Sequence, residues 1–346
     1  MGTDRQPTAS GLDPSSPASA DTTMRAIAAQ AYGSADVLHL ARLPRPEVSD
    51  KEVLVHVHAA GLDRGTWHLM TGQPYLLRLA FGIRRPRNPV PGRDAAGTVV
   101  AVGSAVTRFS VGDEVFGVAP GSFAEYAVAR EDKLARRPAR LTVEQAAVVP
   151  ISALTALQAL TDVGRVQRGQ KVLITGASGG VGSYAVQIAK ALGAEVTGVC
   201  STAKLDLVRS LGADHVIDYT HEDFADGVHR YDLIIDIAGN PSLSRLRRAL
   251  TPTGTLVLVG GEEGGRWTGG TIGRQLRARA LSLVVRQRLT SCLAAERGSD
   301  LDRLTELIEA GSVTPSIDRT YPLDDVPAAM RHLEAGNARG KIAITI

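Results

Sequence analysis

The sequence predicts an α/β protein of two domains, a small β-rich domain and a doubly wound parallel sheet. The chain has 346 residues, more than one compact core usually holds. Short apolar runs broken by turn residues occupy the part before about Pro150, which is typical of strands. From Lys171 onward, strand-like and helix-like segments alternate, which indicates parallel strands joined by right-handed crossovers.

The first domain shows its strands most clearly in the runs 52–58 (EVLVHVH) and 97–102 (GTVVAV). In the first run, the valines occupy one face of the strand, and His56 and His58 occupy the other. No acidic or cysteine partner accompanies the two histidines. We therefore interpret them as surface residues rather than metal ligands.

The second domain is expected to alternate strands with helices that end near Leu192 and Gly212. Nearly continuous apolar runs are typical of strands covered on both faces. The expected strands are KVLITGA from Lys171, EVTGVCS from Glu195, HVIDY from His215, DLIIDIAG from Asp232, GTLVLVGG from Gly254 and LSLVV at 281–285. After about Arg288, two helix patterns each end in glycine, and the closing KIAITI is a strand expected to rejoin the first domain.

Composition excludes several classes of protein. Lysine and arginine number 39 and aspartate and glutamate 36, so the net charge of +3 is too small for a nucleic-acid-binding surface. No apolar stretch is long enough to span a bilayer, and no membrane partner is expected. Residues 1–23 lack a signal peptide's hydrophobic centre and are predicted to be a disordered tail. Two cysteines cannot form a disulfide framework, which favours a cytoplasmic location.

A glycine-rich turn, Ala177–Gly182 (ASGGVG), lies between an apolar strand and an amphipathic helix. This context predicts a dinucleotide-binding turn. Gly179 would let the backbone approach a diphosphate, Gly182 would let helix and strand pack closely, and the amino end of the helix would attract the anion. Ala177 stands where the pattern usually has its first glycine.

Two other interpretations of this turn remain open. The same residues spell G-x-S-x-G around Ser178, the nucleophile motif of serine hydrolases, for which Asp236 and His332 could complete a triad. No HGGG-type oxyanion segment precedes the turn. The turn could also bind nothing, although three glycines within four residues are entropically costly without a closely approaching partner.

The end of the next strand bears on the choice of cofactor. An NAD site would place a carboxylate there for the ribose hydroxyls. The chain instead reads Cys200, Ser201, Thr202, Ala203 and Lys204. Hydroxyls and a lysine suit a phosphate, so the sequence favours NADPH.

Taken together, these motifs resemble the medium-chain dehydrogenase/reductase superfamily, and specifically its zinc-independent, zeta-crystallin-like quinone oxidoreductase branch. The resemblance covers essentially Met24 to Ile346. It implies a GroES-like catalytic domain formed by 24–151 and 289–346, with a Rossmann NADP-binding domain, 152–288, inserted between them. The motifs that carry it are AAGLDRGTW from Ala59, NPVPGRDAAGTVVAVGSAVTRFSVGDEVFG from Asn88, ITGASGGVGSYAVQIAKALGAEV from Ile174, LGADHVIDY from Leu211 and GNARGKIAI from Gly336.

The resemblance also implies chemistry without a metal. Zinc-dependent relatives carry a cysteine and a His-Glu pair where this chain has Asp63, Arg93 and Asp94. A catalytic zinc is therefore not expected. Hydride must then pass to an acceptor that delocalises its developing charge, and quinones and conjugated enones meet that condition.

The resemblance assigns the remaining site residues. Tyr219 joins Ser201 and Lys204 around the adenosine 2′-phosphate, and Lys341 is a further residue that could reach the cofactor. The full cofactor set is Thr155, Ser178, Gly179, Gly180, Val181, Gly182, Ser201, Lys204, Tyr219, Gly239, Gly260 and Asn337. Asp63, Trp67, Tyr75 and Arg93 belong to segments that line the substrate pocket, although Trp67 and Tyr75 are equally consistent with core aromatics.

No catalytic side chain is assigned. Asp63 stands where relatives more often have asparagine, and a reduced quinone can take protons from water. The sequence thus predicts a homodimeric, zinc-independent NADPH-dependent reductase of quinones or α,β-unsaturated carbonyls. A non-catalytic NADPH-binding protein is the alternative from a different class.

Overall fold

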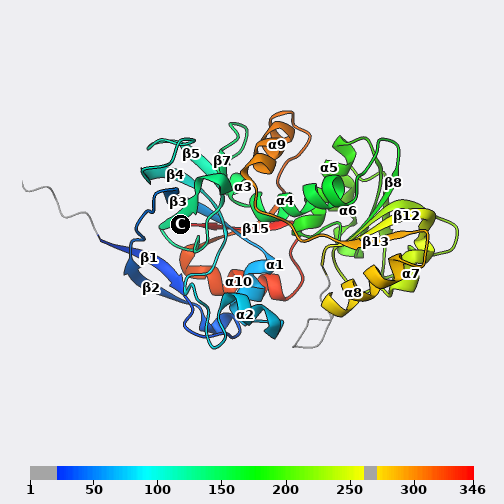
Figure 1. Ribbon diagram of the computed structural model, residues 1–346, viewed down its shortest axis with the longest axis horizontal. Helices are drawn as coiled ribbons and strands as arrows, with labels where there is room; N and C mark the ends of the chain where they lie inside the picture. The colour runs from blue at the N-terminus through cyan, green and yellow to red at the C-terminus, as the bar shows by residue number, and fades with distance from the viewer. Residues whose placement is uncertain (1–21, 261–270) are drawn as a thin grey trace, which may run out of the picture.

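The structure, a computed structural model, describes residues 22–260 and 271–346 (Figure 1). Most of the predicted tail lies outside these residues, but Thr23 begins the first strand. The strands of the first domain form a two-stranded and a seven-stranded sheet. They are β1 (Thr23–Ala28), β2 (His39–Pro44), β3 (Glu52–Leu62), β4 (Asp94–Val102), β5 (Glu114–Val118), β6 (Tyr126–Arg130), β7 (Leu134–Arg136), β14 (Ile317–Pro322) and β15 (Lys341–Thr345).

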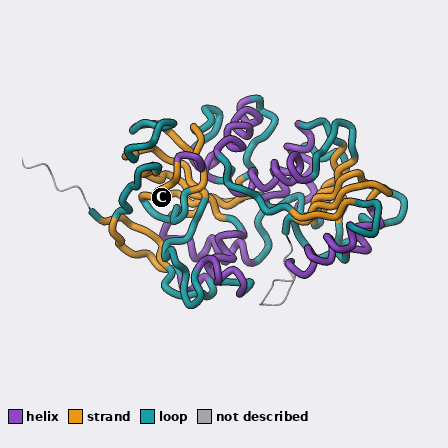
Figure 2. The backbone as a smooth tube through the Cα atoms, in the orientation of Figure 1, coloured by secondary structure: helices purple, strands orange, loops and turns teal. Residues whose placement is uncertain are grey.

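A third sheet has six strands in the order β10-β9-β8-β11-β12-β13, all paired in parallel. This confirms the predicted doubly wound sheet, and Figure 2 shows it as a group of strands apart from the strands of the first domain. Its members are β8 (Lys171–Thr175), β9 (Glu195–Cys200), β10 (His215–Asp218), β11 (Tyr231–Asp236), β12 (Leu250–Leu258) and β13 (Arg288–Ser291).

Helices cover the sheets and connect them. The helices are α1 (Arg64–Thr71), α2 (Arg78–Phe81), α3 (Val143–Ala147), α4 (Pro150–Gln158), α5 (Gly180–Ala191), α6 (Leu205–Ser210), α7 (Leu243–Ala249), α8 (Thr271–Ser282), α9 (Gly298–Glu309) and α10 (Val326–Glu334). The closing strand β15 pairs with β3 in antiparallel register, from Ile342 opposite Leu62 to Thr345 opposite Ala59. The end of the chain therefore rejoins the first domain, as predicted.

The prediction of a strand at 281–285 was wrong. α8 continues to Ser282, and the last strand of the sheet is β13, which pairs with β12. A short apolar run does not by itself distinguish a strand from a helix end, and the arginine-rich residues before it continued the helix. Because β13 ends at Ser291, residues 289–291 lie in the six-stranded sheet rather than in the segment that returns to the first domain.

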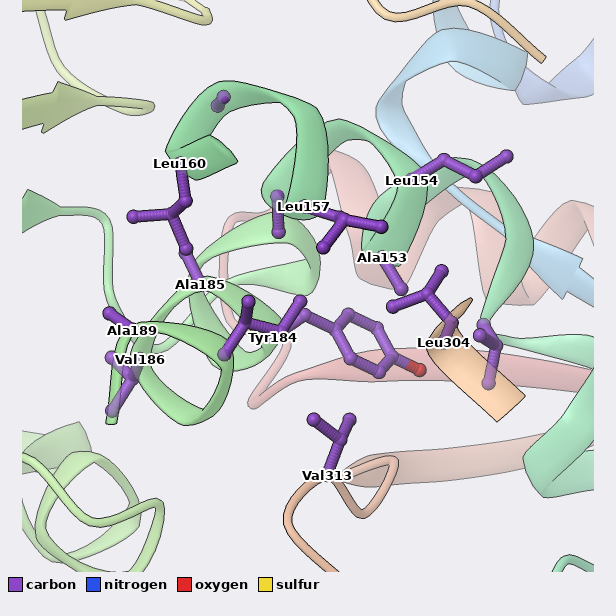
Figure 3. Close-up of a cluster of buried hydrophobic side chains, with 14 of the residues drawn as sticks. Ala153, Leu154, Leu157, Leu160, Tyr184, Ala185, Val186, Ala189, Leu304 and Val313 are labelled. Atoms are coloured by element: carbon purple, nitrogen blue, oxygen red, sulfur yellow. The ribbon is translucent and has the colours of Figure 1, made fainter. Parts of the chain in front are cut away.

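The largest buried cluster joins the two domains at α4 and α5. Tyr184 of α5 is completely buried there, and its hydroxyl donates a hydrogen bond to the carbonyl of Val148 at 3.0 Å. Figure 3 shows its ring between Leu157 of α4 and Val313, with Leu304 of α9 beside it. The glycine-rich turn at the start of α5 is thus attached to a buried, closely packed junction.

Candidate cofactor and substrate site

The strand order of the six-stranded sheet reverses between β8 and β11. β8 lies between β9 and β11 and pairs in parallel with both. Crossovers leave the sheet toward opposite faces at such a point, which opens a crevice at the carboxyl ends of the strands where α/β sheets bind ligands. The glycine-rich turn, 176–182, directly follows β8 and therefore lies at this crevice.

Two glycines of the turn have different physical roles. A Cβ atom on Gly182 would lie 2.0 Å from the carbonyl oxygen of Gly176, so the packing of α5 on the turn requires glycine. A Cβ atom on Gly179 would meet only that oxygen, at 3.4 Å, an ordinary contact. Gly179 therefore leaves open a space that a side chain would fill. Both observations fit the roles predicted for these residues.

The amino end of α5 offers free hydrogen-bond donors. Gly179 is the N-cap and supplies no side chain to bond the first amides. The amide of Ser183 donates to the carbonyl of Gly179 and is the first donor of the helix, so the amides of Gly180, Val181 and Gly182 precede the first intrahelical donor. Together with the helix dipole, they form a site for an anion. The diphosphate of a dinucleotide fits this donor set and the space beside Gly179.

Ser201, Lys204 and Tyr219 gather at the neighbouring ends of β9 and β10. The amide of Tyr219 donates to the carbonyl of Cys200, which brings this residue beside the start of the Ser201–Lys204 turn. The Tyr219 side chain is 59% exposed. The structure therefore places the three residues predicted at the 2′-phosphate on one edge of the sheet.

Lys204 also connects this edge to the end of the chain. Its Nζ atom donates to the carbonyls of Gly336 and Ala338, each at 2.9 Å. Asn337 lies between these two carbonyls and is exposed. The sequence had suggested Lys204 and Asn337 as cofactor residues. The hydrogen bonds that join Lys204 to the residues on either side of Asn337 were not predicted.

Asp218, which sequence reasoning did not consider, lies at the same edge. Its carboxylate accepts hydrogen bonds from the hydroxyls of Thr202, at 2.5 Å, and Thr220, at 2.6 Å. These bonds hold the pKa of Asp218 below its usual range. A carboxylate is thus present at the end of β10, one strand beyond the end of β9 where an NAD site would place it, and each of its oxygens accepts a hydrogen bond from the protein.

A buried polar cluster lies behind the glycine turn. Lys341 donates from Nζ to Ser152 Oγ at 2.9 Å, and the same nitrogen is 3.5 Å from Asp94 Oδ2. Burial raises the pKa of Asp94 to about 7, and the Lys341 ammonium acts in the opposite direction. A Cβ atom on Gly180 would lie 3.1 Å from the Lys341 stem. Lys341 therefore supports the turn from inside the protein, where the sequence had suggested a contact with the cofactor.

The other predicted cofactor residues have local explanations. The hydroxyl of Thr155 donates to the carbonyl of Ile151 at 2.7 Å, so it is satisfied within α4. Gly239 has a φ of 78°, and a Cβ atom on Gly260 would lie 2.2 Å from the carbonyl oxygen of Ile237. Both glycines follow the carboxyl ends of β11 and β12, at the same edge of the sheet as the turn.

A second buried ion pair, missed from the sequence, lies at the end of β11. Asp236 accepts a hydrogen bond from the Thr175 hydroxyl at 2.9 Å and lies 2.7 Å from Arg274 Nη2. Arg274 also donates to the carbonyl of Pro241 at 2.9 Å. Burial raises the pKa of Asp236 to about 6, while Arg274 acts to lower it. No sequence spacing relates α8 to β11, so this pair had no local signal.

The structure does not assemble the serine-hydrolase triad. Asp236 is bound to Thr175 and Arg274, as described above. His332 Nε2 lies 2.6 Å from Asp318 Oδ2, in the first domain. The two residues proposed to activate Ser178 are therefore occupied by other partners.

Asp63 has a structural role at the start of α1. Its Oδ1 atom accepts a hydrogen bond from the Thr66 amide at 2.7 Å, which caps the helix. Its Oδ2 atom is buried and has no hydrogen-bond partner in the parts of the chain described. Its charge raises the pKa of Asp94. Asparagine would cap the helix equally well, so the departure from the family's usual residue preserves this function.

Each of the other predicted pocket residues has a partner of its own. Trp67 Nε1 donates to Glu334 Oε1 at 2.7 Å, and Arg93 forms an ion pair with Glu296. The Tyr75 ring faces the guanidinium of Arg78, 4.4 Å from its centroid. Two cavities, of about 590 and 310 Å³, are lined by other residues. The structure therefore does not bring the four predicted residues together around either cavity.

The residues at the zinc positions do not fit a zinc ion. Asp94 faces the ammonium of Lys341, and Arg93 itself brings a positive charge. Each of these cations already pairs with a carboxylate, Lys341 with Asp94 and Arg93 with Glu296, and neither has a lone pair to offer a metal ion. Within residues 22–260 and 271–346, no group of three or more histidine, cysteine, aspartate or glutamate side chains is arranged to hold a metal.

Comparisons with known proteins agree with this architecture. Residues 49–139 match a family model described as alcohol dehydrogenase GroES-like domain, and residues 211–344 match one described as zinc-binding dehydrogenase. The zinc of that description belongs to the family; the residues of this chain do not fit the ion.

Relatives match almost the whole chain. The mouse mitochondrial NAD(P)H oxidoreductase RTN4IP1 is 34% identical over 94% of this chain and 90% of its own length. The Arabidopsis thaliana chloroplast envelope quinone oxidoreductase homolog is 32% identical over 93% and 98%. The solved quinone oxidoreductase from Coxiella burnetii superposes with a TM-score of 0.82 at 29% identity, covering 94% of this chain and 99% of that chain. The chain therefore belongs to the medium-chain dehydrogenase/reductase superfamily, in its quinone oxidoreductase-like branch of NAD(P)H oxidoreductases.

Proposed function

We propose that this protein is a zinc-independent reductase that uses NADPH to reduce a quinone or an α,β-unsaturated carbonyl. The observation that carries the proposal is the uncapped amino end of α5 beside Gly179, at the point where the strand order reverses. Similar proteins support the substrate class, since they include quinone oxidoreductase homologs and a tomato 2-methylene-furan-3-one reductase. A mycobacterial relative, 29% identical, was solved in complex with NADPH.

In this proposal, the residues of the chain bind and orient. The amides of Gly180, Val181 and Gly182 hold the diphosphate, and the missing side chain of Gly179 admits it. Ser201, Lys204 and Tyr219 hold the 2′-phosphate. When bound, NADPH supplies the hydride. The acceptor lies between the domains, beside the segments that contain Asp63 and Arg93. A reduced quinone takes its protons from water, so no side chain is required as a general acid.

The choice of NADPH over NADH rests on the charge at the end of β9. Lys204 supplies a cation there, while the nearby Asp218 carboxylate is occupied by the Thr202 and Thr220 hydroxyls. The lysine therefore favours a phosphate over ribose hydroxyls at this position.

The test is NADPH oxidation, followed by its absorbance, with 1,4-naphthoquinone, a linear enone and a simple ketone, before and after incubation with a metal chelator. The proposal expects activity with the first two acceptors and no effect of the chelator. Loss of activity on chelation would contradict the zinc-independent mechanism. NADPH binding without oxidation by any acceptor would instead establish the non-catalytic alternative.

We also propose that the protein is a homodimer joined through β13. This strand lies at the edge of its sheet, and exposed apolar residues flank it: Leu283 is 87% exposed and Leu293 97%. An edge strand flanked by exposed apolar side chains is suited to a contact with another chain. Light scattering should give twice the 36.4 kDa chain mass, and Leu293→Glu should give the monomer. A monomeric wild type would contradict this arrangement.

The cytoplasmic location stays a prediction.

A further inference from the structure

A surface segment of the first domain, residues 75–87, combines exposed apolar side chains with exposed arginines. Leu76 is 46% exposed, Leu79 65%, Phe81 42% and Ile83 70%. Arg84, Arg85 and Arg87 follow and are also exposed, and the segment contains no acidic residue. We call the seven side chains of these residues the α2 patch.

The α2 patch is held in place by its neighbours. Arg78 lies over the rings of Tyr32 and Tyr75, 4.4 Å from each centroid, and donates to the carbonyl of Gly72 at 2.9 Å. The Tyr32 hydroxyl donates to the carbonyl of Gly82 at 2.5 Å. One side of the segment is thus anchored, while its apolar side faces outward. Figure 1 shows α2 at the rim of the molecule, beside α1 and α10.

The arginines of the α2 patch are available for an external anion. Among the described residues, no ion pair joins Arg84, Arg85 or Arg87 to a carboxylate. Several apolar side chains gathered in one place are unusual on a surface that faces only water. Apolar side chains next to several unpaired cations have the composition of interfacial segments, which insert apolar groups at headgroup level and hold lipid phosphates with arginines.

A second copy of the chain fits the α2 patch less well. A twofold contact through the patch would place the three arginines of one copy near those of the other, which is repulsive. Nucleic acid would engage the arginines and leave the four apolar side chains in water. An anionic bilayer is complementary to both parts of the patch.

We propose that the α2 patch binds the surface of anionic lipid bilayers. This changes the expectation drawn from the sequence that no membrane is a partner. That expectation concerned spanning helices, and in the described residues no helix is long and apolar enough to cross a bilayer. Peripheral binding requires no such helix. The proposal is independent of the reaction proposed above.

The experiment is cosedimentation of the full-length protein with phosphatidylcholine vesicles that contain either no phosphatidylglycerol or about one third. The wild type should bind the anionic vesicles at least about tenfold more strongly, and added salt should weaken the binding. R84Q/R85Q/R87Q should lose about 100-fold in partition coefficient. L79S/I83S should lose about tenfold or more, because its apolar contacts are removed.

Matched controls change the same chemistry elsewhere. V228S alters another exposed apolar residue, 79% exposed, and R230Q/R248Q/R279Q removes three exposed arginines from the other domain. Both should bind as the wild type does. Circular dichroism establishes that each variant is folded, and the arginine variant tests the proposal even if L79S/I83S does not fold. The proposal would be overturned if the wild type bound both kinds of vesicle equally, or if the control variants lost as much vesicle binding as the α2 patch variants. It would also be overturned if the wild type self-associated and L79S/I83S abolished that self-association.

Discussion

Asp63 carries one carboxylate oxygen that caps α1 and a second that is buried beside Asp94. Asp63→Asn should keep the cap and remove a charge, so the free energy of unfolding should stay the same or rise. Asp63→Ala should lose the cap and about 1 kcal/mol. Urea denaturation measures both. Equal destabilisation by the two substitutions would mean that the charge, rather than the cap, is what the fold needs.

Lys204 is the cation on which the cofactor choice depends. Lys204→Ala should raise the KM for NADPH about tenfold, because a charged hydrogen bond to the 2′-phosphate is lost. The KM for NADH should change much less. Arg209→Ala removes a cation from the adjacent α6, where it pairs with Asp206 at 3.3 Å, and serves as the control. Lys204 also binds the carbonyls of Gly336 and Ala338. An equal rise in the KM for NADPH and for NADH would therefore show that Lys204 acts only by holding this segment in place.

Among the elements, the junction of β8 and α5 depends on one glycine. Gly182→Ala should cost more than about 2 kcal/mol of stability, because the new methyl group collides with the Gly176 carbonyl and the backbone must move. Gly179→Ala is the matched control. It should cost no more than about 1 kcal/mol, the difference between glycine and alanine at an N-cap. Thermal and urea unfolding compare the two, and a stable Gly182→Ala protein would contradict the described packing.

Most elements could be predicted from the sequence because their signals are local. The apolar run of β8, the glycines after it and the helix pattern of α5 lie within about twenty consecutive residues. The contacts that organise the site could not be predicted from the sequence, because they join residues far apart in the chain. Lys204 and Ala338 are separated by 134 residues, and Lys341 and Ser152 by 189. Local signals can also fail. The apolar run 281–285 was wrongly predicted to be a strand, because it is too short to distinguish the end of a helix from a strand.

The whole molecule should become less stable as pH rises through neutrality. Asp94 and Asp236 are buried, and burial raises their pKa values to about 7 and about 6. A carboxyl whose pKa is higher in the folded chain binds more protons when folded, so its contribution is fully favourable at low pH and declines as pH rises from about 4 to the folded pKa. For Asp94, the loss between pH 5.5 and pH 8 is about 2 kcal/mol.

The variant D94N/K341M isolates this contribution. It removes both charges of the buried pair while keeping side chains of similar size. Urea denaturation at the two pH values should show a smaller loss of stability in the variant than in the wild type. The same loss in both proteins would mean that the Asp94 carboxyl does not titrate in this range.

The measurement that tests the account most directly is the affinity for NADPH of the chelator-treated wild type and of Gly179→Ala, by isothermal titration calorimetry. The methyl group would occupy the open space beside α5 where the diphosphate is placed. We predict that the wild type binds NADPH without metal, and that Gly179→Ala binds at least about tenfold more weakly while unfolding almost as the wild type does. Unchanged affinity in Gly179→Ala, or no binding by the metal-free wild type, would contradict the account.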